Sequence, residues 1–236
     1  YNNDIRKINL TDNTWQVLPS DMNIYPPRYL SGLGFLNDTL YILGGYGSTT
    51  GSQMVNPHSF FDLVGYSIKN QSLFRKFEIA RIIDDMCVVN TMWIDKINRN
   101  LYALVFEKTK FNGTLQLIRG NISDPAVDFV GNPIPFKIQD IKSNAGLWYF
   151  PAQNKLVACT SYARDTSLTE TGIYSINYPP NKSEVLPRVV HARKNITFYH
   201  LAAGFVLLSG FFVWLFIRIR NHKRKPHASA DSSKPA

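Results

Sequence analysis

The sequence of 236 residues is poor in the side chains that build metal sites and covalent cross-links, with two cysteines and five histidines. Cys87 and Cys159 both stand in apolar, strand-like surroundings. Two cysteines are too few for a disulfide-dense scaffold or for the usual four-ligand zinc patterns. We therefore expect two buried thiols, no metal site and no other cofactor.

Motifs of the common catalytic classes are also missing. There is no glycine-rich phosphate loop with its lysine and no Gly-x-Ser-x-Gly nucleophile elbow. Asp84 and Asp85 could supply the two carboxylates of a glycosidase, but successive strand residues point to opposite faces. His58 and His191 are too isolated to form a copper site. We expect that the chain is not an enzyme.

The positive charge is concentrated at one end of the chain. After residue 217 there are six Lys or Arg and one Asp, which accounts for +5 of the total net charge of +9. The preceding part is close to balanced, so the basic composition is weak evidence for nucleic acid binding. We expect no nucleic acid partner for this chain itself.

A run of 20 residues without Asp, Glu, Lys or Arg extends from Phe198 to Ile217. A helix of this length covers roughly 30 Å, the thickness of the hydrocarbon core of a membrane. The pattern predicts one transmembrane helix, with the preceding domain periplasmic or extracellular and the tail in the cytoplasm. The basic residues that flank its cytoplasmic end are Arg218, Arg220, Lys223, Arg224 and Lys225.

The part before residue 178 contains repeats that are typical of β-strands. A turn with Asn or Asp followed by a short apolar strand occurs three times, at Phe35–Gly45, Ile94–Phe106 and Phe150–Ser161. The return strands begin 61 and 55 residues apart, at Leu40, Leu101 and Leu156. Such a period predicts repeated antiparallel sheets.

A second strand pattern follows each repeat, and one copy carries a family resemblance. The segment Leu40–Tyr46, which contains the double glycine Gly44–Gly45, and the segment Asp62–Tyr66 together resemble a kelch repeat. The resemblance implies four-stranded blades of a β-propeller, similar to the central domain of galactose oxidase. Later copies are degenerate, since Val105–Phe106 and Thr160–Ser161 replace the glycines.

These patterns predict an all-β fold, a partial kelch-like propeller of about three to four blades, followed by one transmembrane α-helix. The expected divisions are a propeller over 1–178, a stalk over 179–197, the helix over 198–217 and a basic cytoplasmic tail over 218–236. A closed propeller has four to eight blades. We therefore expect a fragment whose remaining blades precede Tyr1.

This order of segments is similar to bacterial membrane-anchored sensor and transcriptional-regulator proteins. The resemblance implies an extracytoplasmic propeller that binds a ligand or partner and anchors a signalling protein, with a DNA-binding output domain beyond this chain. Two alternatives stay open. One is a cell-surface adhesion or scaffold propeller, and the other is a membrane-tethered enzyme whose site lies on other blades.

Trp93, Trp148 and Tyr149 stand at the entrances of predicted strands and could stack on sugar rings at a propeller face, although packing between blades is the favoured interpretation. Tyr46 begins a long polar loop, Tyr46–Phe61, that is a candidate recognition loop or a variable surface insertion. The partners that the sequence predicts are a membrane and a carbohydrate or protein ligand, with the oligomeric state open. The candidate ligand-binding residues are Tyr46, Trp93, Trp148 and Tyr149.

Overall fold

The structure is a computed structural model that describes residues 3–52, 54–79, 85–165 and 168–181. All of these residues belong to one compact unit, Tyr1–Val190, and a second unit, His191–Ala236, lies wholly outside the described residues. The described residues form fourteen strands and two 3-10 helices of three residues each. The prediction of an all-β fold is confirmed.

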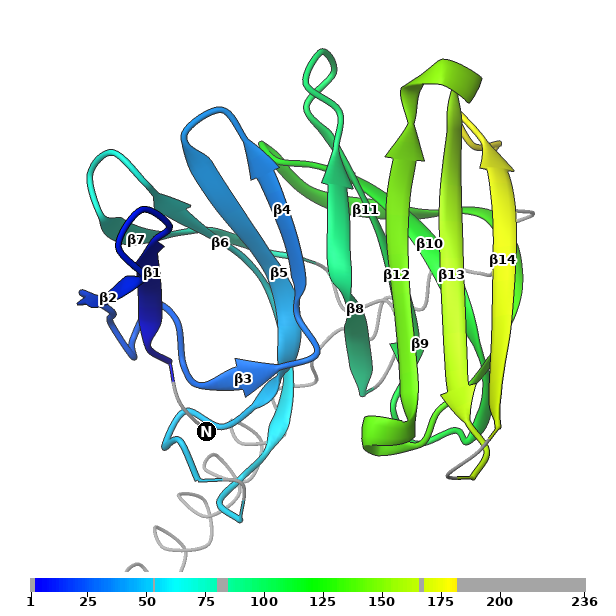
Figure 1. Cartoon of the computed structure of the whole chain (residues 1–236), viewed down its shortest axis with the longest axis horizontal. Coiled ribbons are helices and arrows are strands. Elements are labelled where there is room, and N and C mark those ends of the chain that lie inside the picture. Colours follow the sequence, from blue (N-terminus) through cyan, green and yellow to red (C-terminus); the bar gives the residue numbers. More distant parts are fainter. Residues whose placement is uncertain (1–2, 53, 80–84, 166–167, 182–236) are drawn as a thin grey trace, which may run out of the picture. The chain divides into compact units, whose positions relative to one another are not determined.

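The first sheets are a short hairpin and a meander (Figure 1). Strands β1 (Ile5–Asn9) and β2 (Thr14–Leu18) form a two-stranded sheet of their own. The antiparallel meander that follows consists of β4 (Gly32–Leu36), β5 (Thr39–Gly47), β6 (His58–Ser67) and β7 (Ser72–Glu78). The two-residue strand β3 (Arg28–Tyr29) also pairs with β5.

A second antiparallel meander contains the most deeply buried strands. It consists of β8 (Met86–Ile94), β9 (Asn100–Glu107), β10 (Asn112–Asn121) and β11 (Asp124–Lys137). The first strands of the two meanders, β4 and β8, touch through one parallel pair, Leu33 with Thr91. This single bridge joins the two meanders into one nine-stranded sheet.

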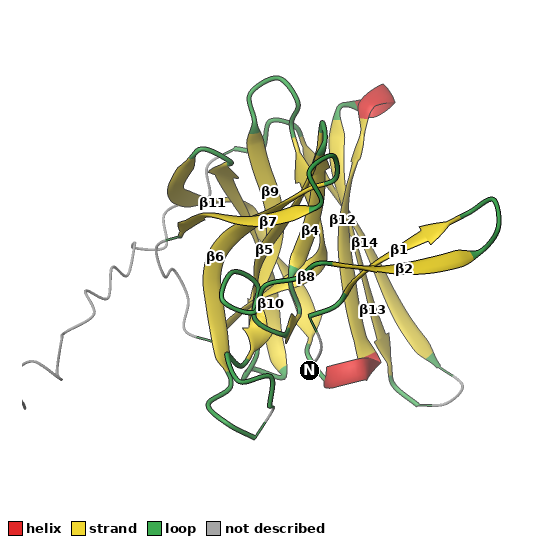
Figure 2. Ribbon diagram, turned by 90° about the vertical axis from the view of Figure 1, so that its left-hand side faces the viewer, coloured by secondary structure: helices red, strands yellow, loops and turns green. Residues whose placement is uncertain are grey.

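The last sheet has three antiparallel strands, β12 (Ser143–Phe150), β13 (Lys155–Ala163) and β14 (Thr169–Asn177). The 3-10 helix η1 (Asp140–Lys142) precedes β12, and η2 (Pro151–Gln153) lies in the turn between β12 and β13. Figure 2 shows these two helices in red among strands and loops. Neither of them contributes a buried residue.

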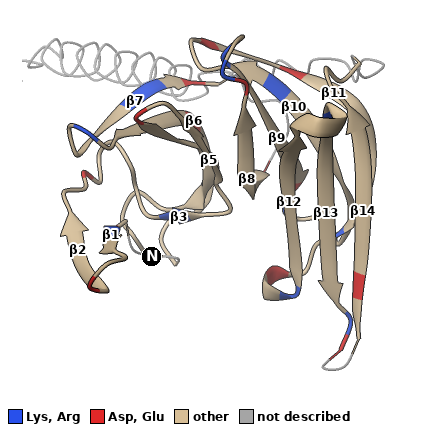
Figure 3. Ribbon diagram, turned by 45° about the horizontal axis from the view of Figure 1, so that its top comes forward, with Lys and Arg blue, Asp and Glu red and all other residues tan. Residues whose placement is uncertain are grey.

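The first strands of the two meanders and of the three-stranded sheet lie beside one another, and the following strands lead away from them. Strand β8 contacts β4 through Leu33 and Thr91. It also contacts β12, where the Leu147 N–H donates a hydrogen bond to the Thr91 hydroxyl oxygen. None of the residues in β4, β8 and β12 is charged, and β8 and β12 are drawn without blue or red in Figure 3. Antiparallel sheets whose first strands gather in this way form a β-propeller-like fold.

One apolar core lies between the two meanders, and a second lies between the β8–β11 meander and the three-stranded sheet. All residues from Leu101 to Phe106 in β9 are buried, because alternate side chains enter different cores. The odd-numbered ones pack with Leu43 and Leu63 of the β4–β7 meander. The even-numbered ones pack with Leu147 and Leu156 of the β12–β14 sheet. The β8–β11 meander is therefore covered on both faces.

The double glycine that supports the kelch resemblance has a conformational reason. Gly44 and Gly45 have φ angles of +59° and +125°, in the region that L side chains rarely adopt. A Cβ on Gly45 would also lie 2.3 Å from the Ser31 hydroxyl oxygen. The close approach of β5 to the segment before β4 therefore requires glycine at this position.

Two predictions about the C-terminal part need correction. No helix within the described residues is both long enough and apolar enough to cross a membrane. The segment Phe198–Ile217, the basic residues that follow it and the predicted stalk beyond residue 181 lie outside the described residues. The fold class is corrected to an all-β, propeller-like fold for the described residues, and the single-pass membrane location is withdrawn.

Candidate functional site

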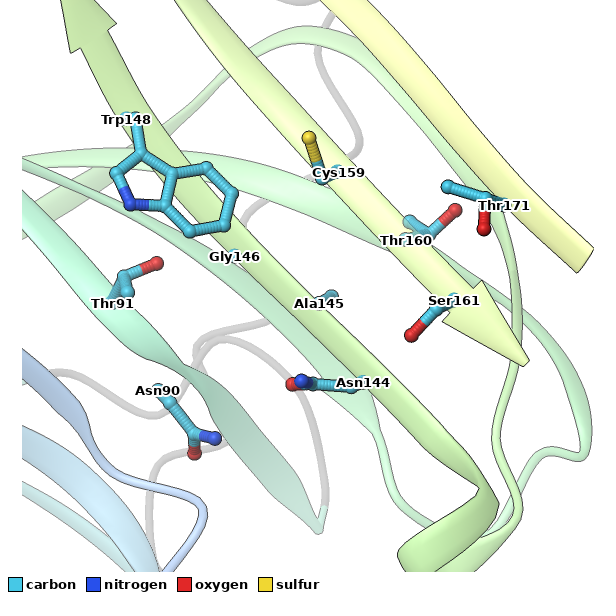
Figure 4. Close-up of a pocket in the computed structure, with 10 residues that line it drawn as sticks. All are labelled: Asn90, Thr91, Asn144, Ala145, Gly146, Trp148, Cys159, Thr160, Ser161 and Thr171. Atoms are coloured by element: carbon cyan, nitrogen blue, oxygen red, sulfur yellow. The ribbon is translucent and has the colours of Figure 1, made fainter. Parts of the chain in front are cut away.

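An open hollow of about 220 Å³ lies on the face of the β12–β14 sheet that is turned away from the core (Figure 4). Its walls come from four strands, β8, β12, β13 and β14. None of the described residues that line it is charged. The lining residues are Asn90, Thr91, Asn144, Ala145, Gly146, Trp148, Cys159, Thr160, Ser161 and Thr171.

The Trp148 indole forms the apolar wall of the hollow, and Gly146 makes its position possible. Leu147 points into the core, so the alternation of the strand turns Trp148 to the opposite face. A Cβ on Gly146 would lie 2.3 Å from the Trp148 ring. The indole therefore lies over the glycine and stays 46% exposed.

Polar groups face the indole across the hollow. Figure 4 shows the Asn144 carboxamide extending toward the side of Asn90, with Ser161 and Thr171 on the β13 and β14 side. Carboxamides and hydroxyls both donate and accept hydrogen bonds. The hollow therefore combines one exposed ring with neutral hydrogen-bonding groups, which suits an uncharged, hydroxyl-rich ligand.

Trp93 and Tyr149, two of the predicted ligand-binding residues, lie away from this hollow. Their rings stack on each other with centroids 4.3 Å apart. Tyr102 and Tyr178 complete an aromatic cluster, with centroids 5.5 Å and 5.0 Å from that of Trp93. This cluster packs against the core between the β8–β11 meander and the β12–β14 sheet.

The aromatic cluster is fixed to a buried carboxylate at Asp95. The Tyr178 hydroxyl donates a hydrogen bond of 2.9 Å to Asp95, and Asn98 donates another of 2.7 Å. Burial acts to raise the pKa of Asp95, but these bonds and the Ile97 N–H together hold that pKa below its ordinary value. Burial and the bond to Asp95 raise the pKa of Tyr178. The network ties the end of β14 to the turn after β8.

Tyr46, the fourth predicted residue, lies at the end of β5 and is also outside the hollow. The Lys108 ammonium lies 3.6 Å from the centroid of the Tyr46 ring, a cation–π contact. The Tyr29 ring stands nearly perpendicular to that of Tyr46, 5.9 Å away. Of the four predicted aromatic residues, Trp148 alone lines the hollow within the described residues.

A buried ion pair that the sequence did not indicate lies inside the β4–β7 meander. Arg28 donates two hydrogen bonds to the carboxylate of Asp62 and one of 3.2 Å to the carbonyl oxygen of Gly44. Its guanidinium group also lies 3.9 Å from the centroid of the Phe60 ring. Both charged side chains are nearly inaccessible to solvent. The pair is part of the interior rather than of a surface site.

A second cavity, of about 210 Å³, lies between the end of β11 and the strands β13 and β14. Lys137 and Glu170 at its rim form an ion pair with each other, and both are partly exposed. The Lys137 ammonium also lies 5.1 Å from the centroid of the Tyr162 ring. Because these charges are already paired with each other, the cavity offers fewer unengaged groups than the Trp148 hollow.

The residues considered for metal or covalent chemistry do not converge. Among the described residues, no three His, Cys, Asp or Glu side chains form a group that could hold a metal ion. Cys87 and Cys159 are free thiols, and burial raises the pKa of Cys87 to about 12. Cys159 is only half-buried, in contrast to the prediction, because it lies in the wall of the hollow. Asp84 and His191 lie outside the described residues.

The chain resembles known proteins in its structure but matches none of them in the sequence comparisons. No family model and no curated protein sequence matches the chain. The solved structures that resemble it include YjhT, with a TM-score of 0.46, 13% identity and coverage of 75% of this chain and 57% of YjhT. The Bombyx mori GH32 β-fructofuranosidase BmSUC1 resembles it with a TM-score of 0.37 and 14% identity over 65% of this chain and 36% of the enzyme. A variant of this enzyme in complex with sucrose gives a TM-score of 0.39 and 15% identity over 69% of this chain and 37% of the enzyme.

The prediction that the chain is not an enzyme is withdrawn, because the structures it resembles include a glycoside hydrolase. Similarity this low assigns no activity to the chain. The chain also spans only about half the length of YjhT and about a third of the length of the β-fructofuranosidase.

Proposed function

We propose that the chain is a carbohydrate-binding module whose site is the Trp148 hollow. The observation that carries the proposal is a half-exposed indole facing carboxamides and hydroxyls in an open depression without charged walls. Sugar rings present apolar C–H faces that stack on aromatic rings, and hydroxyl groups that pair with amides and hydroxyls. The absence of charge from the lining favours a neutral sugar.

The arrangement of the site supports recognition by preformed groups. Trp148 has its place over Gly146, and the inward-facing Leu147 is held by the core and by its bond to Thr91. A ring held in this way loses little conformational entropy when a ligand stacks on it. Asn90 and Asn144 come from different sheets, so a bound sugar would bridge β8 and β12.

The proposal is tested by screening the full chain on a glycan microarray and titrating the sugars that bind by calorimetry. We expect Trp148→Ala to weaken binding at least tenfold and Asn144→Ala to weaken it severalfold. Trp15→Ala is the matched control, because Trp15 is another exposed indole, on β2, and should leave binding unchanged. Equal binding by the Trp148 variant and the natural chain, or no glycan bound at all, would contradict the proposal.

Two further proposals concern the type of propeller and the biological role of the protein. We propose that the sheets are degenerate kelch blades, supported by the double glycine at the end of β5 and by the order of the strands. We further propose that ligand binding serves a sensory or regulatory protein. This second proposal is supported by the resemblance of the sequence alone. The reading frame on both sides of the chain tests it, since a regulatory output domain in the same frame is expected.

A further inference from the structure

The chain is rich in the triplet Asn-x-Ser/Thr, the acceptor sequence for sugars linked to asparagine. Seven triplets of this kind occur, whereas the content of Asn, Ser and Thr predicts about three. The structure describes six of the seven asparagines, which are Asn9, Asn37, Asn70, Asn112, Asn121 and Asn181. An attached sugar is bulky and hydrated, so the fold accepts it only where the carboxamide reaches solvent and is not needed for another contact. The surroundings of each asparagine therefore decide which triplets are open.

Asn37 and Asn70 lie in two neighbouring turns of the β4–β7 meander. The first turn connects β4 with β5, and the second connects β6 with β7. Asp38 joins them, because its carboxylate accepts hydrogen bonds from the Ser67 hydroxyl and from the Lys69 N–H. Both asparagine side chains are exposed, and neither carboxamide hydrogen-bonds a described residue. The turns are thus held in place by Asp38, while the two carboxamides stay open to solvent.

Asn112 offers a third open carboxamide, at the start of β10. It is the first residue of that strand and follows the turn after β9. Its side chain is exposed, as is that of Thr114, which supplies the hydroxyl of the triplet. No contact with another described side chain holds the Asn112 carboxamide. This triplet therefore lies at the margin of the sheet, outside the core.

The carboxamide of Asn121 is part of the fold, although it belongs to the same kind of triplet. Its Nδ2 donates a hydrogen bond of 3.0 Å to the Asn98 carbonyl oxygen and another of 3.1 Å to Oδ1 of Asn100. A sugar replaces one of the two hydrogens on this nitrogen, so one of the bonds would be lost. Asn9 is also engaged, because its side chain interacts with the Asp12 carboxylate in the same turn. These two triplets are therefore less suited to carry a sugar.

We propose that Asn37, Asn70 and Asn112 are sites of N-glycosylation, and that Asn121 stays unmodified. The donor is an activated sugar whose anomeric carbon carries a phosphate or pyrophosphate leaving group. The amide nitrogen forms a bond to the anomeric carbon and gives up one proton, while the bond from that carbon to the phosphate oxygen breaks and its electron pair leaves with the phosphate. None of the three asparagines lines the Trp148 hollow, so the modification is independent of the carbohydrate-binding site.

The proposal is tested on the full-length protein isolated from the cells that produce it, by mass spectrometry of intact glycopeptides. We expect a sugar on Asn37, Asn70 and Asn112, and none on Asn121, which is the internal control. The mass of the attached group identifies the donor, since a single sugar indicates a nucleotide-linked donor and an oligosaccharide indicates a lipid-linked one. Three unmodified asparagines would overturn the proposal, and a sugar on Asn121 would overturn the selection by its hydrogen bonds.

Variants in the third residue of each triplet test whether the triplet itself directs the transfer. Thr39→Ala, Ser72→Ala and Thr114→Ala keep the asparagine but remove the hydroxyl, so each variant should lose one glycan. The matched controls Thr39→Ser, Ser72→Thr and Thr114→Ser preserve the triplet and should keep every glycan. Ser123→Ala, in the triplet of Asn121, should leave the attached mass unchanged. Alanine variants that keep all their glycans would overturn the proposal.

Discussion

Strands β9 and β14 belong to antiparallel sheets of the same kind, yet their sequences follow different rules. In β9 the six residues from Leu101 to Phe106 are all apolar and all buried, because a core lies on each side. In β14 Tyr174 and Ile176 face the core, whereas Ile173 and Ser175 face outward. A strand that is covered on both faces therefore has a continuous apolar sequence, and a strand that is covered on one face has an alternating one.

The largest expected effect comes from breaking a charge pair inside the covered region. Asp62→Asn leaves the buried guanidinium of Arg28 without its counterion, so we expect a loss of about 3–5 kcal/mol in the free energy of unfolding. Glu170→Gln, which breaks the exposed pair with Lys137, is expected to cost much less, because solvent screens that pair. Urea unfolding of both variants measures the difference, and equal losses would contradict it.

A pair of truncations compares a covered strand with the open face directly. Leu104→Ala removes a fully buried side chain from β9 and should cost about 2–5 kcal/mol. Ile173→Ala removes an exposed side chain of similar size from β14 and should change stability by about 0.5 kcal/mol or less, measured on the monomer. A large cost for Ile173→Ala in dilute solution would show that the outer face is already packed within a single chain.

The network that holds the end of β14 gives a smaller, pH-dependent effect. Tyr178→Phe removes the hydrogen bond to the Asp95 carboxylate and should cost about 1–3 kcal/mol at pH 7. The pKa of Asp95 is lowered in the folded chain, so its contribution is present above its ordinary pKa of 3.8 and declines as the pH falls further. The difference between the natural chain and Tyr178→Phe should therefore shrink between pH 7 and pH 3, as urea unfolding would show. A constant difference would contradict the role of the Asp95 charge.

The repeated hairpins could be predicted from the sequence because their signal is local. The predicted return strands at Leu40, Leu101 and Leu156 are confirmed, each lying one residue inside β5, β9 or β13. Strand β11 was not predicted. It contains three prolines and two aspartates, and its register shifts near Gly131, which leaves no regular alternation. Its pairing with β10 becomes visible only in three dimensions.

The candidate site, too, could be predicted from the sequence only where the signal is local. Trp148 was recognisable as an aromatic residue in a predicted hairpin, but Tyr149 follows it directly and therefore had to point to the opposite face. Asn90 and Ser161 have no local pattern that brings them to Trp148, since they come from separate strands. Arg28 and Asp62 are 34 residues apart, so their buried pair also has no sequence signal.

The most direct test of the contrast between covered and open faces uses the two cysteines. Cys87 lies fully buried in β8 with its pKa raised from 9.0 to about 12, which lowers its thiolate fraction roughly 1,000-fold, whereas Cys159 lies in the wall of the open hollow. The measurement is the rate of iodoacetamide labelling of each cysteine in the native chain, followed by mass spectrometry. We expect Cys159 to be labelled at least a hundredfold faster than Cys87, and Cys87 to react only when the chain is unfolded in urea. Equal rates for the two thiols in the native chain would contradict the account of one sheet covered on both faces and one sheet open on its outer face.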